Sequence, residues 1–461
     1  MSNDLQAIRL QNYKAFKDTG WIEMANLTLL LGYNSNGKST ILKALEMIQK
    51  CYQQLQIGQE LPVLTTNDKE DGSFEDMIYK GSKENTIIFS FRFRVQDEDI
   101  KEGFEEFLDI EHDEKAEIIY QLFFTKCEKE IEVIKYSISL DNQNLYTCEK
   151  IDQCNYNVTS DFAEILPAMY EVCNSFFLRR LNEDIYPSKL TKEEIMDKIA
   201  PANRFVYHFF DNIVLGCLNT ALRNFASDLE YILPLRAVPS RQMLIQLDKS
   251  RKVGTSGEHV YRILYQAYFS ADVELKEKVN KWLQLFGYTY EWNELKPNYG
   301  EFLLVDMKTG HKINIVDVGF GISQILPIIV AACEDGKGYL LLDSPEAHLH
   351  SRVQSSLGDL LIDAARKRKV VVETHSENIM LRVQKRIVEN NDIDKEFARI
   401  YFIHEANGET VCEPIQFNEY GDFIDCSLEF TQFFSDGFKD VMDITTLKAM
   451  KYQEEKNGHS N

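Results

Sequence analysis

One stretch, residues 28–48, constrains the fold of this chain more than any other. An aliphatic run ends at Gly32, and Gly37-Lys38-Ser39-Thr40 follows at the spacing G-x-x-x-x-G-K-S. Apolar residues then recur at helical spacing, at Ile41, Leu42, Leu45 and Ile48. A strand, a glycine-bounded loop and a helix in this order predict a phosphate-binding loop, because backbone N–H groups and the helix N-terminus point at an anion.

We expect this loop to bind a nucleoside triphosphate together with Mg²⁺. Lys38 would reach the β- and γ-phosphates, and the Ser39 hydroxyl would complete the Mg²⁺ shell. The other loop residues predicted to contact the nucleotide are Asn34, Asn36, Gly37 and Thr40. The alternative is a glycine-rich turn before an ordinary helix, which the flanking strand and helix patterns disfavour.

A second part of the site is predicted near residue 343. The apolar run GYLLLD (338–343) ends in Asp343, and KVVVETHSE (369–377) is a further β-branched run that reaches His375. Buried strands that end in polar residues suit positions beside the phosphate-loop strand, where a carboxylate can hold Mg²⁺. The alternatives are an N-cap role for Asp343 and a strand-end structural role for His375.

A glycine-punctuated stretch, VDVGFGISQILPII (316–329), continues as a short apolar helix. Its first turn would hold Ser323 and Gln324, and it predicts a second anion site at a helix N-terminus. Such turns are common, so this pattern alone is a weak signal.

Composition narrows the class of protein. The 461 residues suit one large elaborated domain or two. Lys and Arg total 51 against 73 Asp and Glu, a net charge of −22, which argues against a face that coats nucleic acid and against an anionic membrane surface. No secretory signal or transmembrane-length apolar run is visible, and the nine cysteines are odd in number without a C-x-x-C pair. We therefore expect a cytoplasmic protein with reduced thiols.

Two clusters of basic residues are candidates for binding DNA. AARKRKV (364–370) is expected to end a helix, where cations complement the helix dipole. The loop-rich cluster is the better candidate for facing DNA; it comprises Arg236, Arg241, Lys249, Arg251 and Lys252.

With these parts together, the chain resembles the ABC-type ATPases of the SMC, RecF and OLD kind. LQNYKAFKD resembles their first hairpin, GYNSNGKST their Walker A, and GYLLLDSPEAHLH the Walker B and D-loop of the OLD-like branch. VDVGFGISQILP resembles that branch's signature, and ETHSE its switch-histidine loop. Segments 74–80, 233–241, 253–264 and 398–423 are similar to a bacterial subfamily that occurs in antiphage defence, as in the ATPase subunits of Septu and PARIS systems.

The resemblance implies an α/β fold: an ABC-ATPase-like P-loop domain whose mixed sheet has N-terminal antiparallel strands. We expect residues 1–150 to form the first part of the ATPase domain and 301–385 its second part, with a mainly helical insertion at 151–300. A small α/β extension would follow at 386–447 and a disordered tail at 448–461.

The resemblance also implies roles for individual residues. Asp343 would be the Walker B carboxylate, Glu346 would position the attacking water, and His375 would sense the γ-phosphate. Ser323, with Gln324, would reach ATP held by a second subunit. Two departures stand out: Ser344 occupies the usual position of the catalytic glutamate, and Ser351 replaces the usual proline after His-Leu-His. For the glutamine loop, Gln49 is the candidate.

These roles imply an ATPase that self-associates head to tail, as a dimer or a larger even-numbered assembly. The expected function is the ATPase subunit of an antiphage defence complex that controls a partner nuclease or toxin. The alternatives are a nucleotide-gated scaffold with little turnover, a DNA-repair ATPase of the RecF or SMC type, and, less favoured because of chain length, the ATPase subunit of a transporter.

Overall fold

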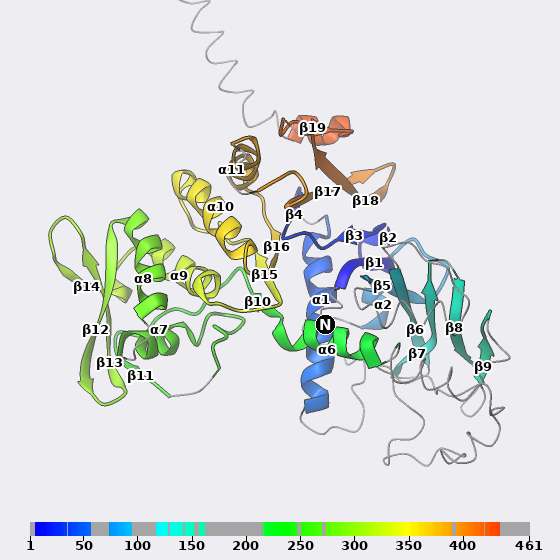
Figure 1. Cartoon of the computed structure of the whole chain (residues 1–461), viewed down its shortest axis with the longest axis horizontal. Coiled ribbons are helices and arrows are strands. Elements are labelled where there is room, and N and C mark those ends of the chain that lie inside the picture. The colour runs from blue at the N-terminus through cyan, green and yellow to red at the C-terminus, as the bar shows by residue number, and fades with distance from the viewer. Residues whose placement is uncertain are drawn as a thin grey trace, which may run out of the picture.

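The computed structural model describes residues 5–34, 36–56, 73–94, 117–127, 130–141, 143–151, 156–161, 214, 216–246, 250–269, 273–389, 393–418 and 420–433. These residues form three sheets with helices between and around them (Figure 1). Residues 162–213 of the predicted helical insertion and the predicted tail at 448–461 lie outside the described residues.

The central sheet carries the phosphate loop. Its strand order is β10 (Glu230–Ile232), β15 (Tyr339–Asp343), β16 (Lys369–Glu373), β4 (Leu27–Gly32), β17 (Ala398–Ala406), β18 (Glu409–Phe417) and β19 (Phe423–Ile424). The strands from β10 to β17 are parallel, and β18 and β19 are antiparallel. β15 is buried along its whole length, as expected for a parallel strand covered on both faces.

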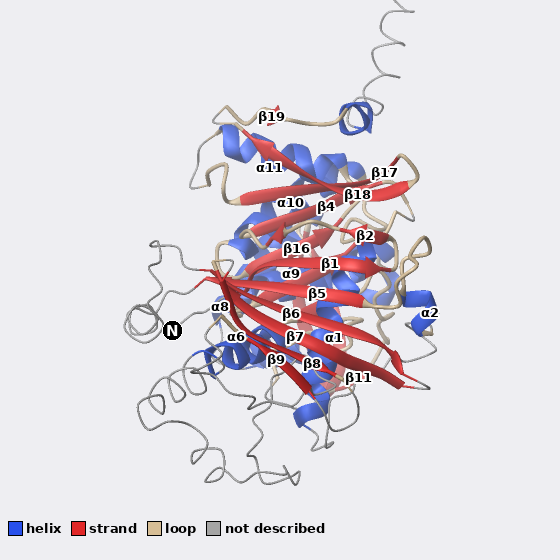
Figure 2. Cartoon of the chain, turned by 90° about the vertical axis from the view of Figure 1, so that its right-hand side faces the viewer, coloured by secondary structure: helices blue, strands red, loops and turns tan. Residues whose placement is uncertain are grey.

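An antiparallel sheet covers one face of the central sheet. It contains β1 (Leu5–Tyr13), β2 (Phe16–Asp18), β3 (Ile22–Glu23), β5 (Ile87–Arg94), β6 (Glu117–Cys127), β7 (Glu130–Leu140), β8 (Gln143–Lys150) and β9 (Tyr156–Thr159). Figure 2 shows these strands fanning out in front of α1 (Lys38–Gln56). The core on this face joins α1 and α6 (Gly216–Asp228) to both sheets; the short α2 (Phe74–Met77) also packs there.

Helices and a small third sheet cover the opposite face. The helices are α7 (Val260–Phe269), α8 (Val273–Leu283), α9 (Phe320–Cys333), α10 (Ser351–Ala365) and α11 (Glu377–Val388), with 3-10 turns at Gln284–Phe286 and Ile315–Asp317. The third sheet contains β11 (Met243–Leu244), β12 (Tyr288–Lys296), β13 (Tyr299–Asp306) and β14 (Lys312–Asn314). Side chains of β4 alternate between the two cores, with Leu30 on one side and Leu29 and Leu31 on the other.

The predicted fold class is confirmed: this is a P-loop ATPase fold with an N-terminal antiparallel sheet. Two segments contribute more strands to the sheets than the sequence predicted.

The range 151–300 contains strands as well as helices, and its strand β10 joins the central sheet. In the range 386–447, β17 pairs directly with β4, so it belongs to the ATPase sheet. Among the residues that the structure describes, no helix combines the length and apolar character needed to cross a membrane.

A buried ion pair ties β10 into the molecule. The Arg368 guanidinium donates to the Glu230 carboxylate at 3.0 Å, and the two side chains are only 4% and 6% exposed. Arg368 also donates to the Ala331 carbonyl. Its neighbours in the basic cluster form ion pairs at the surface, Arg366 with Asp363 and Lys367 with Asp335. The helix-end interpretation of 364–370 therefore fits, with Arg368 as a structural exception.

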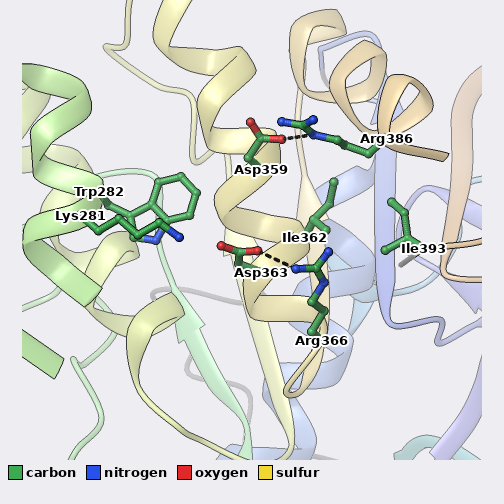
Figure 3. Close-up of a pocket in the computed structure, with 8 residues that line it drawn as sticks. All are labelled: Lys281, Trp282, Asp359, Ile362, Asp363, Arg366, Arg386 and Ile393. Carbon is green, nitrogen blue, oxygen red and sulfur yellow. Dashed lines mark hydrogen bonds and ion pairs between the residues drawn. The ribbon is translucent and has the colours of Figure 1, made fainter. Parts of the chain in front are cut away.

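A cavity of about 290 Å³ lies beside α8, α10 and α11 (Figure 3). Its carboxylates face arginines: Asp359 accepts from Arg386, and Asp363 from Arg366. Trp282 forms another part of the wall. None of its lining residues belongs to the predicted nucleotide site.

Candidate nucleotide site

The loop between β4 and α1 has the backbone of a phosphate loop. Gly32 has φ +147°, and a Cβ there would lie 2.1 Å from the Ile403 carbonyl oxygen. Gly37 has φ +93°, and its Cβ would lie 2.6 Å from the Ala15 Cβ in the β1–β2 turn. Only glycine fits at either position. The loop therefore passes close to β17 and to the first hairpin before α1 begins at Lys38.

Lys38 is folded back onto this loop. Its side chain is 2% exposed, and its ammonium donates to the carbonyls of Gly32 at 3.0 Å and Tyr33 at 2.7 Å. Burial lowers its pKa, and nearby carboxylates oppose that shift. The loop residues Asn34 and Asn36 are more open to solvent. The amide N–H of Thr40 donates to the Gly37 carbonyl at 3.0 Å, which closes the first turn.

The parallel register places two carboxylates beside the loop. Asp343 on β15 and Glu373 on β16 are direct partners, and Glu373 is also opposite Leu30 on β4. Both carboxylates interact electrostatically with the Lys38 ammonium. The structure thus brings together Lys38, Ser39 and Asp343 at the carboxyl edge of the sheet, as the sequence predicted. This is the edge where ligands bind in parallel α/β sheets.

Glu373 is a site residue that sequence reasoning missed. Its side chain hydrogen-bonds Ser39, and burial together with the Asp343 charge raises its pKa to about 7. The available signal was an acidic residue that ends an apolar strand, which is the same signal that identified Asp343.

The turn after β15 carries Glu346. Ser344 has a left-handed backbone with φ +45°, and its hydroxyl donates to the Asp343 carboxylate at 2.9 Å. The buried Glu346 carboxylate accepts from the His375 backbone N–H at 2.7 Å. Burial raises the pKa of Glu346. The structure therefore places Glu346 at the site edge, while the Ser344 hydroxyl is engaged with the predicted Mg²⁺ ligand.

His375 lies on the solvent side of the same edge. Its side chain is exposed and hydrogen-bonds the Gly32 backbone. Partial burial and the Lys38 ammonium lower its pKa, so its imidazole is neutral at pH 7. A neutral imidazole has one N–H, so a hydrogen bond donated to a phosphate oxygen would replace the one to the Gly32 backbone.

Ser323 and Gln324 lie in the first two turns of α9. The buried Ser323 hydroxyl donates to the Phe320 carbonyl at 2.8 Å. Gln324 is 0% exposed, and its amide group bonds the backbone of Arg236. A role for either residue in a second subunit's site stays a prediction, and within one subunit Gln324 faces inward. Gln49 is also buried and donates to the Leu229 carbonyl.

The proposed DNA-facing cluster is dispersed in the structure. Arg236 is 4% exposed and faces the site, which corrects its placement on a basic surface. Arg241 pairs with Asp317 at 2.8 Å and Arg251 with Glu334 at 3.2 Å. Lys252 donates to two main-chain carbonyls, and Lys249 lies outside the described residues. Most of the described basic side chains of this cluster are therefore bound to acidic side chains or main-chain carbonyls of the same chain.

The donor set fits Mg²⁺ bound with a triphosphate. Ser39, Asp343 and Glu373 offer hydroxyl and carboxylate oxygens, which are the ligands that Mg²⁺ prefers. One oxygen of Glu373 and one of Glu346 are buried without a hydrogen-bond partner among the residues that the structure describes. Within the described residues, no group of three or more His, Cys, Asp or Glu is arranged to hold a metal alone.

Comparison with known families adds sequence support to this geometry. A profile described as "AAA ATPase domain" matches residues 4–232, and one described as "AAA domain, putative AbiEii toxin, Type IV TA system" matches residues 174–381. The first covers the phosphate loop, and the second covers Asp343 and His375. The two profiles together are similar to sequence on both sides of the nucleotide site. No curated protein matches the chain.

Solved structures with some likeness to this chain include SMC head domains. One, bound to the C-winged helix domain of ScpA, is 12% identical with a TM-score of 0.46, covering 90% of this chain and 98% of that one. The Thermotoga maritima SMC head is 12% identical (TM-score 0.41; 90% and 99% covered). A Pyrococcus furiosus SMC head, bound to the C-terminal domain of ScpA, is 11% identical (0.43; 90% and 96%). At these scores the fold assignment rests on the sheet topology described above.

Replacing Glu373 should stabilise the metal-free protein. Its pKa of about 7 lies above the usual 4.5, so its ionised form destabilises the folded state increasingly as pH rises from about 4.5 to about 7. We expect Glu373→Gln to raise the free energy of unfolding by about 2–3 kcal/mol at pH 8 in EDTA, and by little at pH 4.5. Urea unfolding at both pH values measures this. A gain that is equal at both pH values would contradict the assignment.

Proposed function

We propose that this protein binds and hydrolyses Mg-ATP. The observation that carries the proposal is that Lys38, Ser39 and Asp343 converge at one edge of the central sheet. Asp343 lies about three hundred positions after the other two in the sequence. Phosphoryl transfer needs mainly positioning and charge neutralisation. A buried ammonium, a hydroxyl and a carboxylate beside a helix N-terminus supply both.

Each side chain has a distinct part in this proposal. Lys38 exchanges its two loop carbonyls for phosphate oxygens when the triphosphate enters. Ser39 and Asp343 hold Mg²⁺, which neutralises charge that develops on the phosphates. Glu346 orients the attacking water from the turn after β15, and His375 contacts the γ-phosphate.

Lys38→Ala tests nucleotide binding. We expect the dissociation constant for Mg-ATP, measured by isothermal titration calorimetry, to rise at least about 100-fold, which corresponds to about 2.7 kcal/mol. Lys43→Ala, a change in the same helix, is the control and should bind as the wild type does. Equal heats for wild type and Lys38→Ala would remove the proposal.

The finer proposal is the ATPase subunit of an antiphage defence complex that self-associates head to tail through α9 and controls a nuclease or toxin. One support is the match over 174–381 to a profile whose description includes a toxin of a toxin–antitoxin system. The motif resemblance to defence ATPases is the other. Purified protein that cleaves DNA alone, through residues outside the nucleotide site, would contradict control of a separate nuclease.

A nucleotide-gated scaffold with little turnover is the second candidate. The observation that favours it is Ser344, which stands where related ATPases place the catalytic glutamate and whose hydroxyl bonds Asp343. Single-turnover hydrolysis separates the two proposals. A wild-type rate equal to that of Lys38→Ala indicates the scaffold, and a clear difference indicates the enzyme.

A further inference from the structure

We propose that Arg236 is a positioning residue that links helix α9 to the Asp343–Glu346 turn. A change in the position of one of these two elements then changes the position of the other. This inference rests on the proposed ATPase function and assigns a role to a residue for which the sequence analysis predicted only a DNA-facing position. Arg236 lies in the segment that follows β10. Because β10 and β15 are parallel neighbours, that segment emerges beside Asp343.

The first contact of Arg236 is with α9. The Arg236 backbone N–H donates to Oε1 of Gln324 at 3.1 Å, and Nε2 of Gln324 donates to the Arg236 carbonyl at 3.3 Å. Gln324 is 0% exposed, so water does not compete for these bonds. The paired bonds fix the position of the Arg236 main chain relative to α9.

The second contact is with the turn that carries the acidic residues. Nη2 of Arg236 donates to the carbonyl of Asp343 at 3.1 Å and lies 3.4 Å from that of Ser344. This turn and the two residues after it contain two non-glycine residues with left-handed backbones, Ser344 at φ +45° and His348 at φ +66°. Such conformations persist only where surrounding contacts hold them. The arginine supplies contacts of that kind from a different element.

The guanidinium retains unused donors in a buried place. Its Nε and Nη1 groups have no hydrogen-bond partner in the described part of the chain, and neither has Oε2 of Glu346. Arg236 and Glu346 attract each other electrostatically. Buried donors and acceptors that lack partners are costly, so a shift that joins the two side chains is favourable. A move of α9 would therefore change the position of Glu346 through Arg236.

A parallel route exists and must be separated from this one. The Phe320 ring, at the start of α9, contacts the His348 ring edge-on with centroids 4.9 Å apart. Both side chains are exposed, whereas the Gln324–Arg236 link is buried. Hydrogen bonds in the interior have fewer alternative partners than rings at the surface, so we assign the coupling to Arg236.

Hydrogen–deuterium exchange of the full chain tests the link without hydrolysis. The probe is Mg²⁺ with the non-hydrolysable ATP analogue AMP-PNP, at a protein concentration where size-exclusion chromatography shows monomer. In the wild type we expect slower exchange in peptides spanning 33–42, 233–238 and 320–327. Gln324→Leu breaks the first contact, and Arg236→Met breaks the second. In both variants we expect protection against exchange to remain at 33–42. At 320–327 the slowing of exchange by AMP-PNP should be at least threefold smaller than in the wild type.

The controls separate this inference from the proposed function and from misfolding. Arg241→Gln alters an exposed arginine of the same segment and should behave as the wild type does. Arg236→Lys keeps the charge and the main-chain bonds, so it covers the case in which one of the other two variants fails to fold. Protection at 320–327 that persists in Gln324→Leu, or is lost in Phe320→Ala alone, overturns the link. Absent protection at 33–42 in the wild type overturns ATP binding itself.

Discussion

Glu346→Gln should lower the single-turnover rate of ATP hydrolysis about 10²- to 10³-fold while leaving the dissociation constant for Mg-ATP within about threefold. The amide has the same shape, and its oxygen can still accept the His375 backbone N–H that the carboxylate accepts now. Only the ability to take a proton from water is lost. Burial raises the pKa of Glu346, which brings this carboxylate closer to the neutral range where a general base works best.

Ser344→Ala is the matched control for this prediction. Ser344 stands directly after Asp343, its backbone already has φ +45°, and alanine removes only the hydroxyl bonded to Asp343. We expect a rate loss of less than about tenfold, as for one hydrogen bond of about 1 kcal/mol. If Ser344→Ala lost as much rate as Glu346→Gln, or if Glu346→Gln kept its rate, another group would be the base. Quench-flow with radiolabelled ATP measures both variants.

Arg368→Met should lower the free energy of unfolding by about 3–5 kcal/mol. The change leaves the buried Glu230 carboxylate without its cation, and an unpaired buried charge is costly. Arg366→Met, two residues earlier, removes an exposed ion pair with Asp363 and should cost less than about 1 kcal/mol. Chemical denaturation of both variants gives the comparison directly.

The second half of that experiment is a double variant. Adding Glu230→Gln to Arg368→Met removes the stranded charge and should recover part of the loss. The glutamine oxygen can still accept the Val253 backbone N–H, but the Ala331 carbonyl loses its Arg368 donor, so recovery stays incomplete. Equal destabilisation by Arg368→Met and Arg366→Met would show that the buried pair contributes no more than a surface pair.

The sequence alone predicted the features that short-range spacing controls. The phosphate loop follows from the eight consecutive positions 32–39, whose glycines and lysine act together, and its strand and helix follow from local periodicity. Asp343 was found because an apolar run that ends in one carboxylate indicates the carboxyl edge of a buried strand. The local periodicity of residues 5–10, 85–95, 258–269 and 273–286 likewise indicates the strands β1 and β5 and the helices α7 and α8.

Only the tertiary structure decided which polar residues face the site from a distance. Arg236 and Arg241 lie five positions apart in one loop, yet one is buried against Asp343 and the other pairs with Asp317 at the surface. Gln324 reaches Arg236 across 88 positions, and Arg236 reaches Asp343 across 107. The identities of these residues are plain in the sequence, but their partners are set by the order of β10, β15 and β16 in the sheet. Local residue spacing does not predict that strand order, because strand pairing depends on how apolar faces that are distant in the sequence pack together.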